Sequence, residues 1–195
     1  MVFSGFAEML QLVSGTACIL TILLTGVPVR AELEVGTKPS PVELSGKCGG
    51  RLDGTPWSSS EIDGKVYSVY YIDPDEADLN EPLFTALKAE GFPREKVQSV
   101  AIINMKATWL PGPVLSKVLK RKQKKYTRTT YVKDNCKKMI AAWNCTDHSS
   151  DIMLFDQQGE VLFSRDGRLS DAEIKTMIDL TWKHIGGKPA DAGEK

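Results

Sequence analysis

Two short apolar segments, residues 65–72 (KVYSVYYI) and residues 97–104 (VQSVAIIN), decide the fold of this chain. Both are rich in β-branched and aromatic residues and lie between turn-forming residues, which is typical of strands buried on both faces. Between them, apolar residues recur at helical spacing from Leu79 to Leu87, and Gly91 ends that pattern. A strand, a helix and a second strand in this order predict a right-handed βαβ unit with parallel strands.

The remaining segments extend this unit into an α/β domain. Asp78 or Asn80 is expected to cap the first helix. The further expected elements are a helix over 113–122, a strand over 129–133, and hairpin strands over 152–156 and 160–164. Ser170 and Glu173 form a capping box at the start of the last helix, which we expect to stop at Gly186. Together these elements predict a central mixed sheet flanked by helices.

The composition of the 195-residue chain is typical of a globular domain, with 42% apolar and 26% charged residues. These fractions exclude a disordered, fibrous or multi-span membrane protein. Lys and Arg total 25, as do Asp and Glu, so no overall charge draws the chain to nucleic acid. Four Cys are too few for a disulfide-rich scaffold, and only two His are present. We therefore predict neither a metal nor another cofactor.

The N-terminal segment is predicted to lie outside the folded domain. Residues 10–29 carry no charge and are long enough to span a bilayer. Residues 1–31 are therefore either a secretory signal peptide or an uncleaved anchor; cleavage after Ala31 is favoured because Pro28 breaks the apolar helix just before it. Both interpretations export the remainder, which we divide into an arm or hairpin over 32–64, a main domain over 65–185 and a tail over 186–195.

The order of elements resembles that of thioredoxin-like proteins, and local sequence narrows the resemblance. The relevant residues are Gly64-Lys65-Val66, Ile103-Asn104, Ala142-Trp143, Phe155-Asp156, Gly159-Glu160-Val161 and Asp166-Gly167 with Leu169-Ser170. Across roughly residues 60–185 the chain resembles the YtfJ family of small periplasmic proteins from Gram-negative bacteria. The resemblance implies a thioredoxin-like fold, a signal peptide and a periplasmic location, but no defined activity.

The residues that carry redox chemistry in thioredoxin-like relatives are missing at the corresponding positions. Such relatives place Cys-x-x-Cys directly after the first core strand, where a helix N-terminus lowers the pKa of a thiol. Here residues 73–78 read DPDEAD, and no Cys lies between Cys48 and Cys136. The relatives also place a proline before the strand that faces this site, whereas residues 149–151 here are Ser-Ser-Asp. We therefore expect a protein that acts by binding rather than by dithiol catalysis.

The alternative is a thiol redox protein that uses Cys136 and Cys145, or Cys48. If Cys18 leaves with a signal peptide, three Cys remain, which allows at most one internal disulfide. A disulfide between Cys136 and Cys145 is favoured, and closing this short loop would stabilise the fold by about 2–3 kcal/mol. Pairing of Cys48 with either of the other two remains open.

The acidic loop has two interpretations. Its carboxylates are Asp73, Asp75, Glu76 and Asp78. Clustered carboxylates suit a hard cation such as Ca²⁺, but the spacing does not fit an EF-hand. The favoured interpretation is a helix N-terminus at which the helix dipole stabilises negative charge.

A strongly basic run lies between Lys117 and Lys138, with ten Lys or Arg against Asp134 alone, a net charge of +9. Its candidate binding residues are Lys120, Arg121, Lys122, Lys124, Lys125, Arg128, Lys133, Lys137 and Lys138. One interpretation is a surface for anionic lipid or an acidic protein partner; the other is a solvated helix end. Nucleic acid is not an expected partner of an exported protein. If the helix end and the following strand share a face, the charges merge into one patch.

Overall fold

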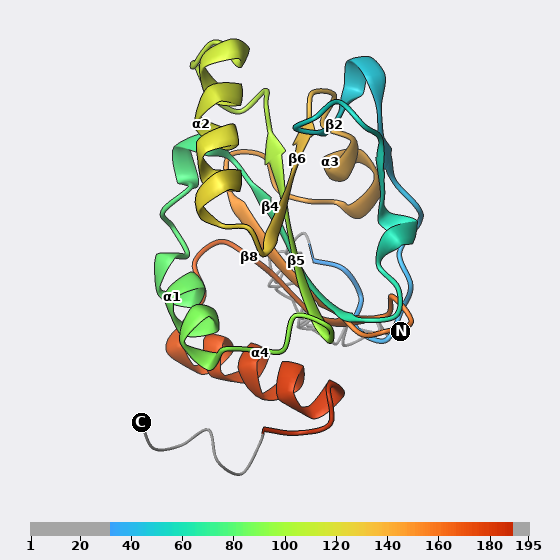
Figure 1. Cartoon of the computed structure of the whole chain (residues 1–195). Coiled ribbons are helices and arrows are strands. Elements are labelled where there is room, and N and C mark those ends of the chain that lie inside the picture. Colours follow the sequence, from blue (N-terminus) through green and yellow to red (C-terminus); the bar gives the residue numbers. More distant parts are fainter. Residues whose placement is uncertain (1–31, 189–195) are drawn as a thin grey trace, which may run out of the picture.

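The computed structural model describes residues 32–188 of the chain (Figure 1). The segment expected to be a signal peptide or anchor, residues 1–31, and most of the expected tail lie outside the described residues. Within residues 32–188, no helix combines the length and the apolar composition needed to cross a bilayer.

The core of the fold is a six-stranded mixed sheet in the order β2-β6-β5-β4-β7-β8. Its strands are β2 (Gly49–Arg51), β4 (Val66–Ile72), β5 (Val97–Asn104), β6 (Thr129–Asp134), β7 (Ser150–Phe155) and β8 (Val161–Asp166). The three central strands β4, β5 and β6 are parallel, and the outer strands pair antiparallel with them or with each other. The predicted mixed sheet with a parallel βαβ centre is confirmed.

Helices cover both faces of this sheet (Figure 1). The side chains of β4 alternate between two buried apolar cores, one on each face. One face packs against α1 (Glu81–Glu90), α2 (Gly112–Lys125) and α4 (Asp171–His184), through buried residues such as Leu83, Leu115 and Met177. The other face packs against α3 (Lys138–Trp143) and the N-terminal arm, through Met139 and Trp57.

The N-terminal arm is tied to the main sheet rather than separate from it. Strands β1 (Glu43–Leu44) and β3 (Trp57–Ser58) pair antiparallel with each other, and β2 between them joins the edge of the large sheet beside β6. Gly49 makes this approach possible, because its φ is 121° and a Cβ there would overlap the carbonyl oxygen of Lys133.

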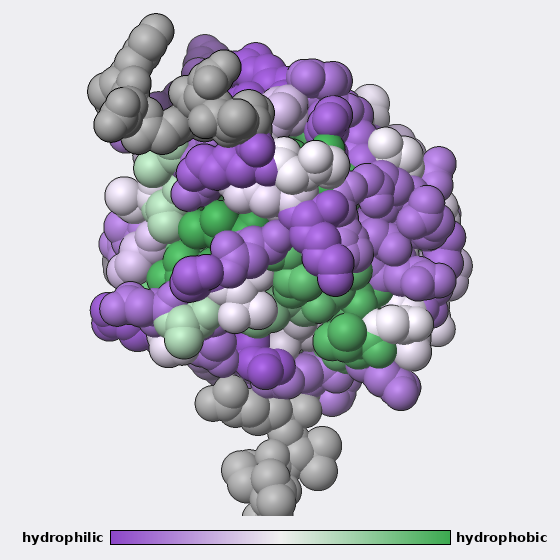
Figure 2. All heavy atoms as spheres, turned by 90° about the horizontal axis from the view of Figure 1, so that it is seen from below, coloured by the Kyte–Doolittle hydropathy of each residue, from purple (hydrophilic) through white to green (hydrophobic). Residues whose placement is uncertain are grey.

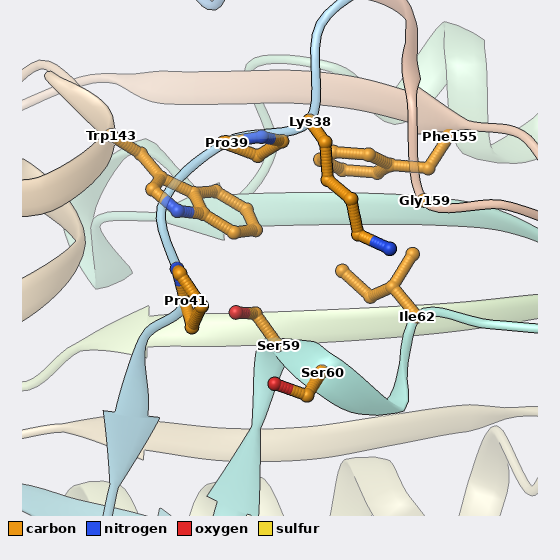
Figure 3. A pocket seen from close by; sticks show the side chains of 9 residues that line it. All are labelled: Lys38, Pro39, Pro41, Ser59, Ser60, Ile62, Trp143, Phe155 and Gly159. Carbon is orange, nitrogen blue, oxygen red and sulfur yellow. The ribbon is translucent and has the colours of Figure 1, made fainter.

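The arm also crosses the second core close to Trp143 and Phe155, as Figure 3 shows. The indole N–H of Trp143 donates to the carbonyl oxygen of Ser40 at 2.8 Å. A hollow of about 40 Å³ remains below the arm, between Lys38 and Ile62. It has room for only a few water molecules, so we do not consider it a ligand site.

The helices α1, α2 and α3 differ from the sequence prediction in their caps or their bounds. The second runs over Gly112–Lys125 and is longer at both ends than predicted. The short helix α3 was not predicted, since it begins after Lys137 in a left-handed conformation and has no capping side chain. Asn80 is the N-cap residue of α1, but its side chain makes no capping bond. The capping box of α4 is confirmed, with the backbone N–H of Glu173 donating to Oγ of Ser170.

Candidate functional site

Asp73 occupies the end of β4, where dithiol relatives carry their redox site. It is fully buried, and within residues 32–188 neither oxygen of its carboxyl group has a hydrogen-bond partner. Burial raises the pKa of this carboxyl group to about 6, an effect that the nearby Asn104 amide and the His148 backbone oppose only in part. Such a group takes up a proton near neutral pH. It has no sulfur and does not exchange disulfides.

Two further carboxylates lie near the same edge of the sheet through strand register. Asp151 stands opposite Tyr71 of β4, and Asp166 of β8 stands opposite Asp151. Both oxygens of Asp151 accept from the backbone N–H of Thr146, at 3.1 and 3.2 Å, while burial raises the pKa of Asp151 to about 8. The sequence analysis missed these residues. The only local signal was an Asp at the end of each paired strand.

The rest of the acidic loop does not join Asp73. Residues 74–76 form a short 3₁₀ helix, on which Asp75 is exposed and accepts from Oγ1 of Thr108 at 2.7 Å. Glu76 is half-buried, and Asp78 is exposed. Among residues 32–188, no group of three or more His, Cys, Asp or Glu side chains is arranged to hold a metal ion. The loop therefore divides into one buried acid and three more exposed ones.

The favoured disulfide between Cys136 and Cys145 is wrong: the structure pairs Cys136 with Cys48, 88 residues away, at a Cα–Cα distance of 5.0 Å. The reason is the antiparallel pairing of β2 with β6, which places Gly49 opposite Asp134 and so brings the preceding Cys48 close to Cys136. This pairing was one of the open alternatives. Cys145 has a free thiol buried in the second core, and burial raises the pKa of that thiol well above its ordinary value.

The basic run does not form the single patch expected from the sequence. Arg128 precedes β6 while Lys137 and Lys138 follow it, and a strand of this length separates the two groups by roughly 20 Å. Lys137 forms an ion pair with Asp147. The Nζ atom of Lys138 donates to the carbonyl oxygen of Glu43 at 2.8 Å. Lys133 lies on β6 itself. The residues Lys120, Arg121, Lys122, Lys124 and Lys125 are on the C-terminal half of α2.

A cleft of about 620 Å³ lies between α1 and α2, over strands β4, β5 and β6. This volume is within the range of about 300–1,000 Å³ that is usual for small-molecule sites. Its walls include the apolar residues Phe84 and Leu87 of α1 and Leu115, Val118 and Leu119 of α2. We regard this cleft as the candidate functional site, although the sequence analysis did not predict it.

The cleft is open because its floor carries small side chains and its walls pack elsewhere. Ser68 of β4 lies opposite Ser99 of β5, and Ala101 lies in the next row between Tyr70 and Tyr131. Central parallel strands are usually filled with Val, Ile and Leu, which would occupy this space. In addition, α1 packs on α4 and α2 packs on β6, so the two helices do not close over the floor.

Comparison with known proteins agrees with this fold. The family described as "Bacterial protein of unknown function (YtfJ_HI0045)" matches residues 47–184. An uncharacterized protein of Haemophilus influenzae is 30% identical over 128 residues, which are 64% of this chain and 70% of that protein. The uncharacterized protein YtfJ of Escherichia coli K12 is 25% identical over 174 residues, covering 84% of this chain and 94% of that protein.

Solved structures extend the likeness to thioredoxin-like proteins. A putative thioredoxin from Neisseria meningitidis has a TM-score of 0.55 at 20% identity, covering 80% of this chain and 94% of the other. A putative protein disulfide isomerase from Bacteroides thetaiotaomicron has a TM-score of 0.56 at 12% identity, covering 78% and 91%. At such identities the likeness shows the fold alone. The fold is thus thioredoxin-like, as the order of elements predicted, and the chain belongs to the YtfJ_HI0045 family.

Proposed function

We propose that this protein is an exported, periplasmic binding protein that has kept the thioredoxin-like scaffold without its dithiol chemistry. The observation that carries the proposal is Asp73, a buried carboxyl group at the position where a catalytic thiol would have to lie. The free thiol of Cys145 is also unsuited to catalysis, because burial raises its pKa and hides it from substrates. The cleft between α1 and α2 supplies a place where such a protein would hold a ligand.

Export is supported by two features. Residues 10–29 have the length and uncharged composition of a secretory signal or anchor. Disulfides such as Cys48–Cys136 form and persist mainly in oxidising compartments. The intact mass of the protein recovered from the periplasm of cells that express the full chain tests this proposal. A mass that lacks residues 1–31 supports a cleaved signal, and recovery of the protein from the cytoplasm alone contradicts export.

A second candidate function, thiol redox chemistry at Cys48 and Cys136, is favoured by one observation. Cys136 is exposed in the structure, so a thiolate from another protein has access to the disulfide. In such a reaction the incoming thiolate would attack one sulfur, form a mixed disulfide and release the other sulfur as a thiolate.

A thiol–disulfide turnover assay separates the two functions. We expect the purified protein to reduce insulin disulfides, with dithiothreitol as electron donor, no faster than dithiothreitol alone. Variants Cys136→Ser and Cys145→Ala provide the matched pair, because only the first removes the exposed sulfur. Turnover that Cys136→Ser abolishes and Cys145→Ala retains would overturn the binding proposal in favour of the redox function.

A further inference from the structure

We propose that the cleft between α1 and α2 binds a single-chain anionic amphiphile, with the head group at the cationic residues of the rim and the apolar chain along the floor. This inference rests on the proposed binding function and names its ligand class. It is carried by the distribution of charge, hydroxyl groups and apolar surface within the cleft.

Topology gathers cations at one end of the cleft. Each of α1 and α2 follows one of the parallel strands and runs back toward the end of the sheet at which those strands start. The C-terminal turns of both helices therefore lie at that end (Figure 1). The residues that precede β5 and β6 lie at the same end of the sheet. The cationic residues that line the cleft are Lys88 of α1, Lys122 and Lys125 of α2, and Arg94 and Arg128 before the two strands.

The described part of the chain offers these cations no carboxylate partner. Within residues 32–188, none of the five forms an ion pair with an Asp or Glu side chain. Arg128 is oriented by donation from Nη2 to the carbonyl oxygen of Phe92, at 2.7 Å. The acidic residues that line the cleft are Glu81, which lies about 10 Å from Lys88 along α1, and Asp78, which precedes that helix. Five cations therefore face two anions, and the cations are at the end of the cleft away from those anions.

The floor carries one row of hydroxyl groups near the cationic end and apolar rows beyond it. Val97 of β5, opposite Val66, lies in the row at the starts of the strands, and Ser68, Ser99 and Thr129 form the row after it. The next rows are Tyr70, Ala101 and Tyr131, and then Ile72 and Ile103. Figure 2 shows the molecule from below the view of Figure 1, and on this face hydrophobic surface lies between hydrophilic side chains. A carboxylate or phosphate head beside the cations could reach the hydroxyl row, and its chain would lie over the apolar side chains beyond that row.

Three probes of equal chain length test the head-group preference: dodecanoate, dodecanol and dodecyltrimethylammonium, each below its micelle concentration. We expect titration of the purified full chain by calorimetry to show dodecanoate bound at least tenfold more tightly than dodecanol. Dodecyltrimethylammonium should bind more weakly than either. Equal affinity for the three, or no binding of any, would overturn the proposal.

Matched variants on one helix test the location. Lys122→Gln with Lys125→Gln removes two cations from the cleft, while Lys120→Gln with Lys124→Gln removes two from the same helix outside it. The first pair should weaken dodecanoate at least fivefold and leave dodecanol unchanged, and the second pair should change neither. Ser99→Phe, which fills the floor, should weaken both probes, with circular dichroism confirming the fold. Equal losses in both Lys pairs would contradict a site in the cleft.

Vesicles distinguish a free amphiphile from a lipid held in a membrane. If phosphatidylglycerol is drawn from vesicles into the cleft, the effects of the two Lys pairs should again differ. If both pairs weaken vesicle binding equally and dodecanoate does not bind, the basic helix end is a membrane-contacting surface and the ligand class proposed for the cleft is wrong. If only this inference fails, dodecanoate does not bind and insulin turnover stays at its background rate. If the proposed binding function fails, insulin turnover rises above that rate.

Discussion

The Nδ1 atom of His148 lies 4.0 Å from Oδ2 of Asp73, although the His148 side chain is 73% exposed and the Asp73 side chain is almost completely buried. His148 precedes β7 in a left-handed conformation, and the neighbouring Ser149 accepts a backbone hydrogen bond from Asp73 at 3.1 Å. An exposed imidazole thus lies beside the buried acid that stands where dithiol relatives carry their redox site. Ionisation of Asp73 should therefore make the free energy of unfolding depend on pH.

Asp73→Asn should stabilise the protein at pH 8 and leave its stability nearly unchanged below pH 4. The pKa of Asp73 is about 6 in the folded state, compared with an ordinary value of 3.8, so the folded state loses stability as pH rises between these values. Because Asn mimics the neutral acid, the gain should grow over this window to at most about 3 kcal/mol. Urea unfolding at pH 4, 6 and 8 measures it.

Asp75→Asn is the control for this series, because it changes an exposed acid of the same loop. It should alter the free energy of unfolding by no more than about 0.5 kcal/mol at any of these pH values. A gain from Asp73→Asn that is the same at pH 4 and pH 8 would show that ionisation of Asp73 is not its cause.

Loss of the Cys48–Cys136 disulfide should lower stability by up to about 4–5 kcal/mol, because the bond closes a long loop and restricts the unfolded chain. The measurement compares the oxidised protein with Cys48→Ala, Cys136→Ala in urea. Cys145→Ala should cost much less, about 1 kcal/mol, since it removes only one buried sulfur. If the double variant were as stable as the oxidised protein, the disulfide would have no structural role.

Asn80→Ala should cost about 3 kcal/mol, because one buried amide joins α1 to the loop before α4. Its oxygen accepts from the backbone N–H of Leu169 at 2.9 Å, and its nitrogen donates to the carbonyl oxygen of Gly167 at 2.9 Å. Asn135→Ala is the control, since that amide donates one exposed bond to Lys47 and should cost less than about 1 kcal/mol. Thermal unfolding of both variants gives the comparison.

Gly49→Ala should disrupt the pairing of β2 with β6, because Ala at φ 121° is strained and its Cβ overlaps the backbone of Lys133. We expect a large loss of thermal stability and faster reduction of the neighbouring disulfide by dithiothreitol. Gly112→Ala, at the start of α2, has open space and ordinary helical geometry, so it should be neutral or slightly stabilising. Equal melting temperatures for the two variants would contradict this account of β2.

Much of the scaffold follows from local sequence patterns. The segments 65–72 and 97–104 are short, apolar and rich in β-branched residues, which predicts buried strands, and the capping box at Ser170 specifies where α4 begins. The absence of a dithiol after β4 is equally a property of the sequence. Short elements were not predictable in this way, because β2 has three residues and α3 six, too few for a periodic pattern.

The sequence by itself therefore determined the α/β class, the parallel βαβ unit and the absence of Cys-x-x-Cys after its first strand, since these depend on residues close together in the chain. Only the tertiary structure decided that Cys48 pairs with Cys136, that β6 divides the basic run, and that Ser68 lies opposite Ser99 under an open cleft. Each of these depends on which distant segments become neighbours. Strand register fixes that choice, and it emerges only when the whole sheet assembles.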